Sequence, residues 1–131
     1  MKRVSARGLV ITDKGLAVIF RRKIKEGKIK EYYVIPGGGI NENEDIIDGL
    51  KRELNEELNI KVNVKDLAFT VETDERIEYF YNCEYISGDF KLIGEELDRM
   101  SQENYYKPTF LKLKELKNFD VQKEVIDYFN K

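Results

Sequence analysis

The residues best suited to chemistry lie in KRELNEELNI, residues 51–60. In a helix of ~3.6 residues per turn, Glu53, Glu56 and Glu57 fall within an arc of about 100°. They border the apolar side of the helix, which is formed by Ile46, Ile47, Leu50, Leu54 and Leu58. Three carboxylates on one edge repel one another, so we expect a divalent cation to compensate them. A site made only of oxygen ligands favours Mg²⁺ or Mn²⁺.

Two further residues of this predicted helix carry information. Arg52 stands four residues before Glu56, in reach of an ion pair that would hold the acid in position, although ordinary surface pairs have the same spacing. Gly49 lies one turn before the acids, where a glycine costs about 1 kcal/mol relative to alanine. We therefore expect that space is needed there for a ligand or a closely packed loop.

A glycine run precedes the helix in PGGG, residues 36–39. Glycine backbone can adopt positive φ and expose its N–H and C=O groups. Such runs before a helix often cradle phosphate or offer a carbonyl oxygen to a metal, so Gly38 and Gly39 are candidate substrate-binding residues. The exit of a strand into a loop would explain the run equally well.

Together, Gly38, Glu44 and the run RELNEELNI resemble the Nudix box, commonly written GX5EX7REUXEEXGU with U an aliphatic residue. The matching positions are Gly38, Glu44, Arg52, Glu53, Leu54, Glu56, Glu57 and Ile60. Asn59 stands where the family normally has glycine, and Asn43 replaces the glycine of a frequent Glu-Pro-Gly. Asn tolerates the left-handed conformation, so we expect a cost in stability and not in chemistry.

The resemblance implies a fold and an activity. The fold would be of the α+β (mixed) class, an α/β/α sandwich in which helices flank a mixed sheet and the box, residues 38–60, forms a loop–helix–loop. Most Nudix proteins hydrolyse a diphosphate bond in a nucleoside diphosphate derivative, such as a (d)NTP or ADP-ribose, with Mg²⁺ or Mn²⁺. The alternative is a nucleotide-sensing module without catalysis, but such modules usually lose the acids that are intact here.

Roles carry over by matched position. Glu53, Glu56 and Glu57 would be metal ligands, helped by a backbone carbonyl of Gly37 or Gly38. Arg52 would orient the acids and Glu44 would brace the box.

Other roles are left open by the sequence. Glu53 or Glu56 could accept a proton from water, and Glu103, in a long predicted loop, is a candidate for an extra base or ligand. Arg21 could meet phosphate or simply be solvated. Tyr33 could stack on a base, although an aromatic residue in a short strand is more often core.

Composition excludes several classes of protein. A chain of 131 residues with 37% charged residues predicts one folded domain, residues 1–131. The absence of His removes the Ser–His–Asp triad and His-based zinc sites, and the lone Cys83 removes an intramolecular disulfide. The net charge of −2 argues against a nucleic-acid polymer as partner, and a small nucleotide is expected instead.

No segment predicts a membrane span, so we expect a cytoplasmic protein. Homodimers are common in the family that the box resembles, although nothing in this sequence determines the oligomeric state.

The remaining sequence predicts the elements that would position these residues. Residues 3–22 read as two strands forming a hairpin about 12–15, and the polar segment 23–31 reads as a flexible connection. Further patterns predict a strand at 32–35, the helix at 45–58, paired strands at 60–73 and 76–86, and a long loop with a possible helical turn at 87–108. Residues 109–116 read as a strand that passes into a turn, and residues 121–131 as a helix.

Overall fold

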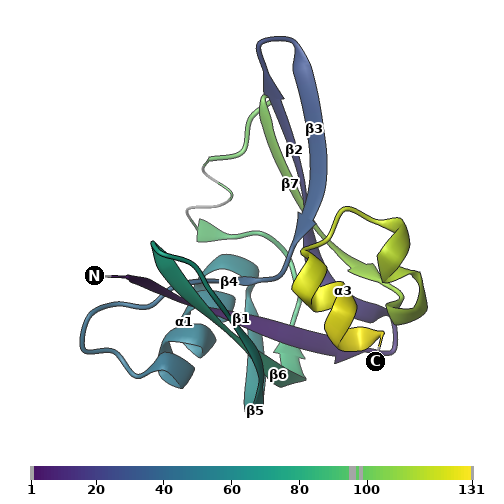
Figure 1. The fold of residues 1–131 in the computed structure, drawn as a ribbon. Coiled ribbons are helices and arrows are strands. Elements are labelled where there is room, and N and C mark those ends of the chain that lie inside the picture. The colour runs from purple at the N-terminus through teal and green to yellow at the C-terminus, as the bar shows by residue number, and fades with distance from the viewer. Residues whose placement is uncertain (1, 95–96, 98, 131) are drawn as a thin grey trace.

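A computed structural model describes residues 2–94, 97 and 99–130. Figure 1 shows helices on either side of a group of strands, with a hairpin of two strands projecting as an arm and a third strand running beside it for part of its length. In chain order the elements are β1 (Arg3–Thr12), β2 (Gly15–Lys25), β3 (Lys28–Val34), β4 (Gly37–Gly39), α1 (Ile46–Leu58), β5 (Ile60–Glu72), β6 (Arg76–Gly88), β7 (Asn104–Leu111), a 3₁₀ helix (Leu113–Asn118) and α3 (Lys123–Phe129).

The strands form two groups that are joined at one hairpin. β1 pairs in parallel with β6 and antiparallel with β4, and β5 pairs antiparallel with β6. β2 lies between β3 and β7 and is antiparallel to both. β1 and β2 share only the pairs Ile11 with Leu16 and Thr12 with Gly15, next to their turn. The sheet is therefore mixed, as predicted, and β2 and β3 extend away from the first group as the arm in Figure 1.

Two apolar clusters hold the helices to the strands. In the first, α1 buries Leu50, Leu54 and Leu58 against β1 and β5. In the second, the 3₁₀ helix and α3 bury Leu116 and Val125 with residues of β1, β2 and β6. This arrangement is the predicted α+β sandwich. No helix in the described part of the chain is both long enough and apolar enough to span a membrane.

Local signals at the ends of α1 agree with the sequence. The Asp45 side chain accepts a hydrogen bond from the Asp48 N–H at 3.1 Å and caps the first turn. Asn59 ends the helix at φ 56° and ψ 40°, and Asn43 has φ 68°. The expectation that both asparagines adopt the left-handed conformation is confirmed.

The prediction of a flexible connection at 23–31 was wrong. β2 runs to Lys25 and β3 begins at Lys28, so the two strands meet in a tight turn at Glu26 (φ 53°) and Gly27 (φ 76°). Two central residues with positive φ match the right-handed twist of a hairpin. The sequence pattern did not predict these strands because the arm is exposed on both sides, so most of its residues are polar.

The long loop predicted at 87–108 is shorter than expected, because β7 already begins at Asn104 and pairs with β2. The helical turn expected in this loop falls partly on residues 95, 96 and 98, which lie outside the described residues. The last helix runs over Lys123–Phe129, within the predicted range 121–131.

Candidate active site

A cavity of about 830 Å³ lies where α1 and β4 face the base of the arm. Its volume is within the range of ~300–1,000 Å³ that small-molecule sites occupy. The cavity brings together the three glutamates of the predicted helix, the glycine run and Arg21: its wall includes Glu53, Glu56, Glu57, Gly37, Gly38, Gly39 and Arg21. With Arg7 of β1 and Val34 of β3 also in the wall, residues of β1, β2, β3, β4 and α1 meet at one site.

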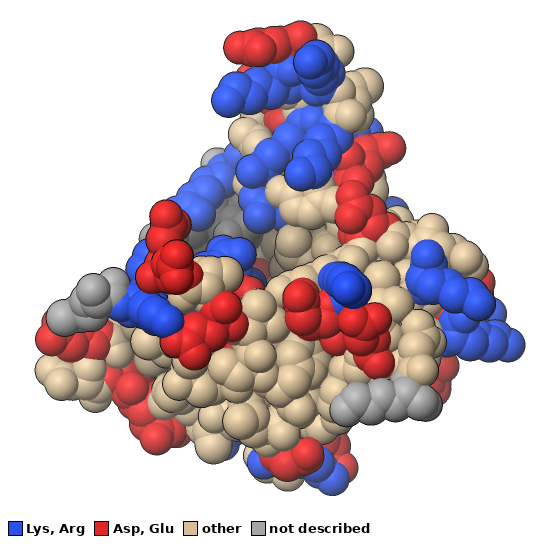
Figure 2. Space-filling view, in the orientation of Figure 1, with Lys and Arg blue, Asp and Glu red and all other residues tan. Residues whose placement is uncertain are grey.

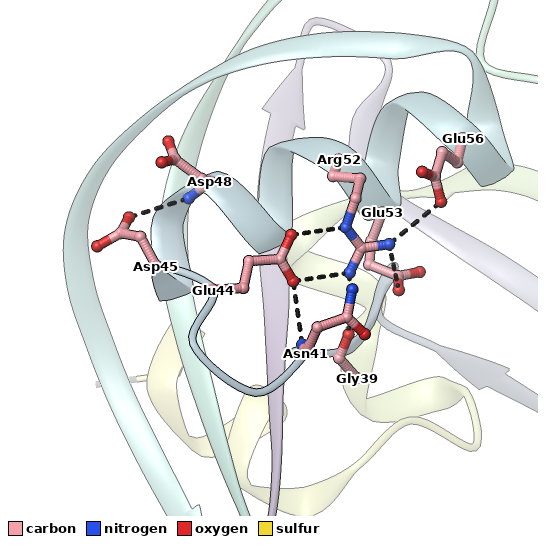
Figure 3. Close-up of polar contacts among 8 residues, drawn as sticks. All are labelled: Gly39, Asn41, Glu44, Asp45, Asp48, Arg52, Glu53 and Glu56. Carbon is pink, nitrogen blue, oxygen red and sulfur yellow. Dashed lines mark hydrogen bonds and ion pairs between the residues drawn. The ribbon is translucent and has the colours of Figure 1, made fainter.

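Arg52 is the centre of the hydrogen-bond network beside this cavity (Figure 3). Its guanidinium binds the Glu44 carboxylate through two parallel hydrogen bonds, Nε to Oε2 at 2.7 Å and Nη2 to Oε1 at 3.0 Å. Nη1 donates to Glu53 Oε1 at 3.2 Å and to Glu56 Oε2 at 3.1 Å, and Nη2 donates to the Gly39 carbonyl at 3.3 Å. The expected pair with Glu56 is thus present, but the two-pronged pair with Glu44 is shorter and less exposed.

Glu44 ties the loop before α1 to the helix. Its Oε1 also accepts a hydrogen bond from the Asn41 N–H at 3.0 Å, which closes the loop (Figure 3). The hydrogen bond from Arg52 lowers the pKa of the Glu44 carboxyl below its ordinary value, and the bond from Asn41 adds to this effect. Glu44 therefore stays ionised and holds the Arg52 guanidinium in one orientation.

Each of three glycines avoids a particular clash. A Cβ at Gly49 would lie 2.6 Å from Ile40 Cδ1 and 3.0 Å from Glu44 Oε1, so this glycine leaves room for the closely packed loop. Gly37 has φ 151°, and a Cβ there would lie 2.0 Å from the Ala6 carbonyl oxygen of β1. A Cβ at Gly38 would lie 2.5 Å from Glu53 Oε2. Gly38 thus keeps open the space that the Glu53 carboxylate occupies.

Glu53 is much less exposed than Glu56, the other acid of α1 that pairs with Arg52. Its side chain is 17% exposed, against 53% for Glu56. Burial raises the pKa of the Glu53 carboxyl, and the positive charge of Arg52 opposes this rise. A half-buried carboxylate with a raised pKa next to a cavity is a candidate proton acceptor.

The donor set suits a hard cation in its chemistry, and its members lie at the wall of one cavity. Glu53, Glu56 and Glu57 line one cavity next to the backbone of β4, and all of their donors are oxygens. As they lie, however, no three Asp, Glu or Cys side chains among the described residues converge closely enough to hold a metal ion. Glu53 and Glu56 instead turn toward Arg52. Binding a cation there would require these carboxylates to rotate.

The candidate substrate residues divide between two places. Arg21 lines the cavity with the glutamates, and its guanidinium lies over the Tyr106 ring, 4.4 Å from the centroid, while donating to the Tyr106 hydroxyl at 2.9 Å. Tyr33 lines a neighbouring cavity of about 370 Å³ instead, and Arg21 lies in the wall of both cavities. Its ring packs against Phe20 and Phe119, with centroids 5.3 Å and 5.4 Å away.

Glu103 does not line either of these cavities. It is exposed, and its backbone carbonyl accepts a hydrogen bond from the Ile24 N–H at 2.9 Å, far along the arm. The structure therefore does not bring this candidate base to the glutamates.

Sequence reasoning did not identify Arg7 as a site residue. Arg7 lines both cavities and pairs with Glu78, Nε to Oε2 at 3.3 Å, while Nη1 donates to the Ile35 carbonyl at 3.2 Å. Glu78 is only 4% exposed. The available signal was a charged residue at an inward position of each strand, Arg7 in β1 and Glu78 in β6. It can be recognised only once these two strands are known to be neighbours.

Known proteins agree with this description. No curated protein shows significant sequence similarity to the chain. Among solved structures, a MutT NUDIX hydrolase from Burkholderia pseudomallei is 18% identical, with 99% of this chain and 97% of that chain covered and a TM-score of 0.74. The MutT protein from Methanosarcina mazei Go1 is 21% identical (98% and 91% covered, TM-score 0.67). An ADP-ribose pyrophosphatase from Streptococcus suis 89-1591 is 14% identical (98% and 90% covered, TM-score 0.67).

At these identities the likeness to solved structures is one of fold. The sequence itself matches the model of the NUDIX domain over residues 1–129. Since this match spans nearly the whole chain and includes the residues around Arg52, the chain belongs to the NUDIX domain family.

Proposed function

We propose that this protein is a Nudix pyrophosphohydrolase that cleaves a diphosphate bond in a nucleotide derivative, with Mg²⁺ or Mn²⁺ as cofactor. The observation that carries the proposal is that Glu53, Glu56 and Glu57 line one cavity together with the glycine strand and Arg21. Membership of the NUDIX domain family supports the same reaction class. The alternative, a nucleotide sensor without catalysis, leaves the complete acid set unexplained.

In this proposal Glu53, Glu56 and Glu57, with a backbone carbonyl of Gly37 or Gly38, would hold the cation. When bound, it would neutralise diphosphate oxygens and lower the pKa of a water molecule. Arg52 and Glu44 would act through Glu53 and Glu56. Their paired hydrogen bonds hold the loop before α1 in a fixed position against the helix. They are positioning residues rather than groups that touch the reacting atoms.

Hydrolysis requires one proton acceptor and a neutralised leaving group. The water oxygen forms a bond to phosphorus, the bond from that phosphorus to the bridging oxygen breaks, and the departing phosphate keeps the bridging oxygen. Glu53 or Glu56 would accept the proton of the water, and the half-buried position of the Glu53 carboxylate at the cavity wall supports Glu53 for this role. Arg21, which lines the same cavity, would meet the negative charge of the phosphates.

A screen of nucleotides with each metal tests the proposal. Nucleoside triphosphates, dinucleoside polyphosphates, a nucleotide sugar and ADP-ribose, the last suggested by the structural relative described above, would be incubated with Mg²⁺ or Mn²⁺. We expect at least one of them to be hydrolysed to a shorter nucleotide, such as a nucleoside monophosphate, only when the metal is present, with the products separated by chromatography. Tight nucleotide binding without hydrolysis under any condition would instead indicate the sensor.

Glu56→Gln and Glu57→Gln test the metal ligands. Each should lower turnover by orders of magnitude and leave the melting temperature equal or higher, because one of several repelling charges is removed. Glu124→Gln provides a control, since Glu124 is an exposed acid in the first turn of α3. Full activity in both cavity variants would show that the metal assignment is wrong.

A further inference from the structure

The two faces of the arm differ sharply in charge. Paired residues on neighbouring strands point to the same face, and β2 pairs Arg21 with Tyr32, Lys23 with Lys30 and Lys25 with Lys28. One face therefore carries five cations and no acid; we call it the basic face, and it consists of Arg21, Lys23, Lys25, Lys28 and Lys30. Figure 2 shows Lys and Arg side chains gathered along the arm above the hollow at its foot.

The opposite face of the arm is balanced. There Arg22 pairs with Glu31, and Phe20 and Ile24 pair with Tyr33 and Ile29. Lysines on an exposed edge strand such as β3 also discourage aggregation, but that function does not require them all on one face. The separation of charge between the two faces thus calls for another explanation.

The basic face is continuous with the active-site cavity. Ile19, Arg21 and Val34 lie on the same face of β2 and β3 as the lysines, and all three line the cavity that holds the glutamates. From Arg21 to Lys25 the strand rises by about 13 Å, at ~3.3 Å per residue. A cavity of about 830 Å³ already accommodates a mononucleotide, so a mononucleotide has no use for the cations farther along.

We propose that the basic face binds the sugar–phosphate backbone of a single-stranded nucleic acid whose 5′-triphosphorylated end enters the cavity. Alternate side chains of a strand are about 6.6 Å apart. This spacing suits the phosphates of a nucleic-acid strand better than the closer phosphates of a polyphosphate chain. Tyr32, half-buried with Lys30 Nζ 5.2 Å from its ring centroid, offers an aromatic surface beside the cations, as single-strand binding sites do.

The net charge of −2 does not oppose this proposal, because a local cluster attracts a polyanion whatever the total. The expectation that no nucleic-acid polymer binds rested on that total. The proposal itself rests on the proposed function: water would cleave one phosphoanhydride bond at the 5′ end, with the bond changes given above. The departing group would be phosphate or pyrophosphate, and the strand would keep a shorter 5′ phosphate.

Salt dependence of binding provides the first test. A 3′-labelled single-stranded RNA of about ten nucleotides with a 5′-triphosphate would be titrated with the whole protein, without added metal, and followed by fluorescence anisotropy. Five phosphate contacts predict that the association constant falls about 100-fold between ~50 mM and ~200 mM salt. In Lys23→Gln/Lys25→Gln/Lys28→Gln two contacts remain, and the fall should be only about 7-fold.

Controls separate this proposal from the alternatives. Lys112→Gln/Lys114→Gln/Lys117→Gln removes the same charge from exposed positions beside and within the 3₁₀ helix and should keep the wild-type salt dependence. Equal salt dependence in wild type and both triple variants, or equal competition by inorganic tripolyphosphate, would overturn the proposal.

Activity provides an independent reading. The arm variant should hydrolyse mononucleotides at the wild-type rate and lose at least tenfold in kcat/KM on the triphosphorylated RNA, because its lysines lie outside the cavity. An equal loss on mononucleotides would show that the lysines serve the cavity, contrary to the proposal. If no nucleotide is hydrolysed at all, the proposed function fails, whereas the binding result still decides whether the basic face holds a nucleic acid.

Discussion

Replacing Gly38 by alanine should move the Glu53 carboxylate, which we propose to be catalytic, without removing it. An added Cβ would lie 2.5 Å from Glu53 Oε2 and 2.6 Å from Glu53 Cδ. To reach ordinary van der Waals contact at 3.4 Å, the carboxylate must move by about 0.9 Å. Since the obstructing group is the end of a flexible side chain, the fold can absorb this movement.

The expected effects on stability and on rate differ in size. Gly38 does not have positive φ, so alanine fits its backbone and restricts the unfolded chain, a gain of about 0.4–1 kcal/mol that offsets the cost of moving Glu53. A misplacement of ~1 Å in an active site costs about 100-fold in rate. That factor corresponds to about 2.7 kcal/mol of transition-state stabilisation.

The assay compares kcat/KM and melting temperature for Gly38→Ala and Gly39→Ala. A Cβ at Gly39 meets no atom within 4 Å, so this neighbour carries the same chemical change without the displacement. We expect a fall of about 100-fold in Gly38→Ala, a much smaller one in Gly39→Ala, and a folded protein in both. Wild-type activity in Gly38→Ala would refute the role of Glu53, and an unfolded variant would refute the reasoning on stability.

Two further predictions concern buried groups. Burial raises the pKa of the Cys83 thiol to about 12 from 9.0, so native protein should react slowly with a thiol reagent at about pH 8 and rapidly after unfolding in urea. Because the pKa of this thiol is higher in the folded state, the stability it contributes is complete below pH 9.0 and is lost as the pH rises toward 12. The free energies of unfolding of Cys83→Ala and wild type, measured by denaturant titration, should therefore converge over that range, and a constant difference would contradict this prediction. Glu78→Ala leaves Arg7 without its carboxylate partner and should lower the free energy of unfolding by about 3 kcal/mol, measured by urea denaturation, whereas a loss under ~1 kcal/mol would mean that the pair is effectively solvated.

Local features of this protein were determined by its sequence alone. The acidic cap at Asp45, the period of the apolar residues in α1 and the asparagine at its end depend on neighbours within a few positions. The box spacing likewise places Glu53 and Glu56 on one edge of a helix whatever surrounds it. These properties were predictable because they need only the geometry of a single helix.

Tertiary structure decided what depends on pairing between distant segments. Segment 23–31 looked flexible because its polar residues lack a buried side, and only the register of β2 with β3 reveals a two-faced arm. The short two-pronged bond of Arg52 to Glu44 likewise needs the folded loop, as does the reason for Gly49. Glu103 lies beside β2 rather than beside the three glutamates of α1, because β7, which follows it, pairs with β2. That pairing joins chain segments far apart in sequence. Residue type determines the chemistry available to a side chain. The long-range pairing of strands determines which other side chains lie close enough to act with it.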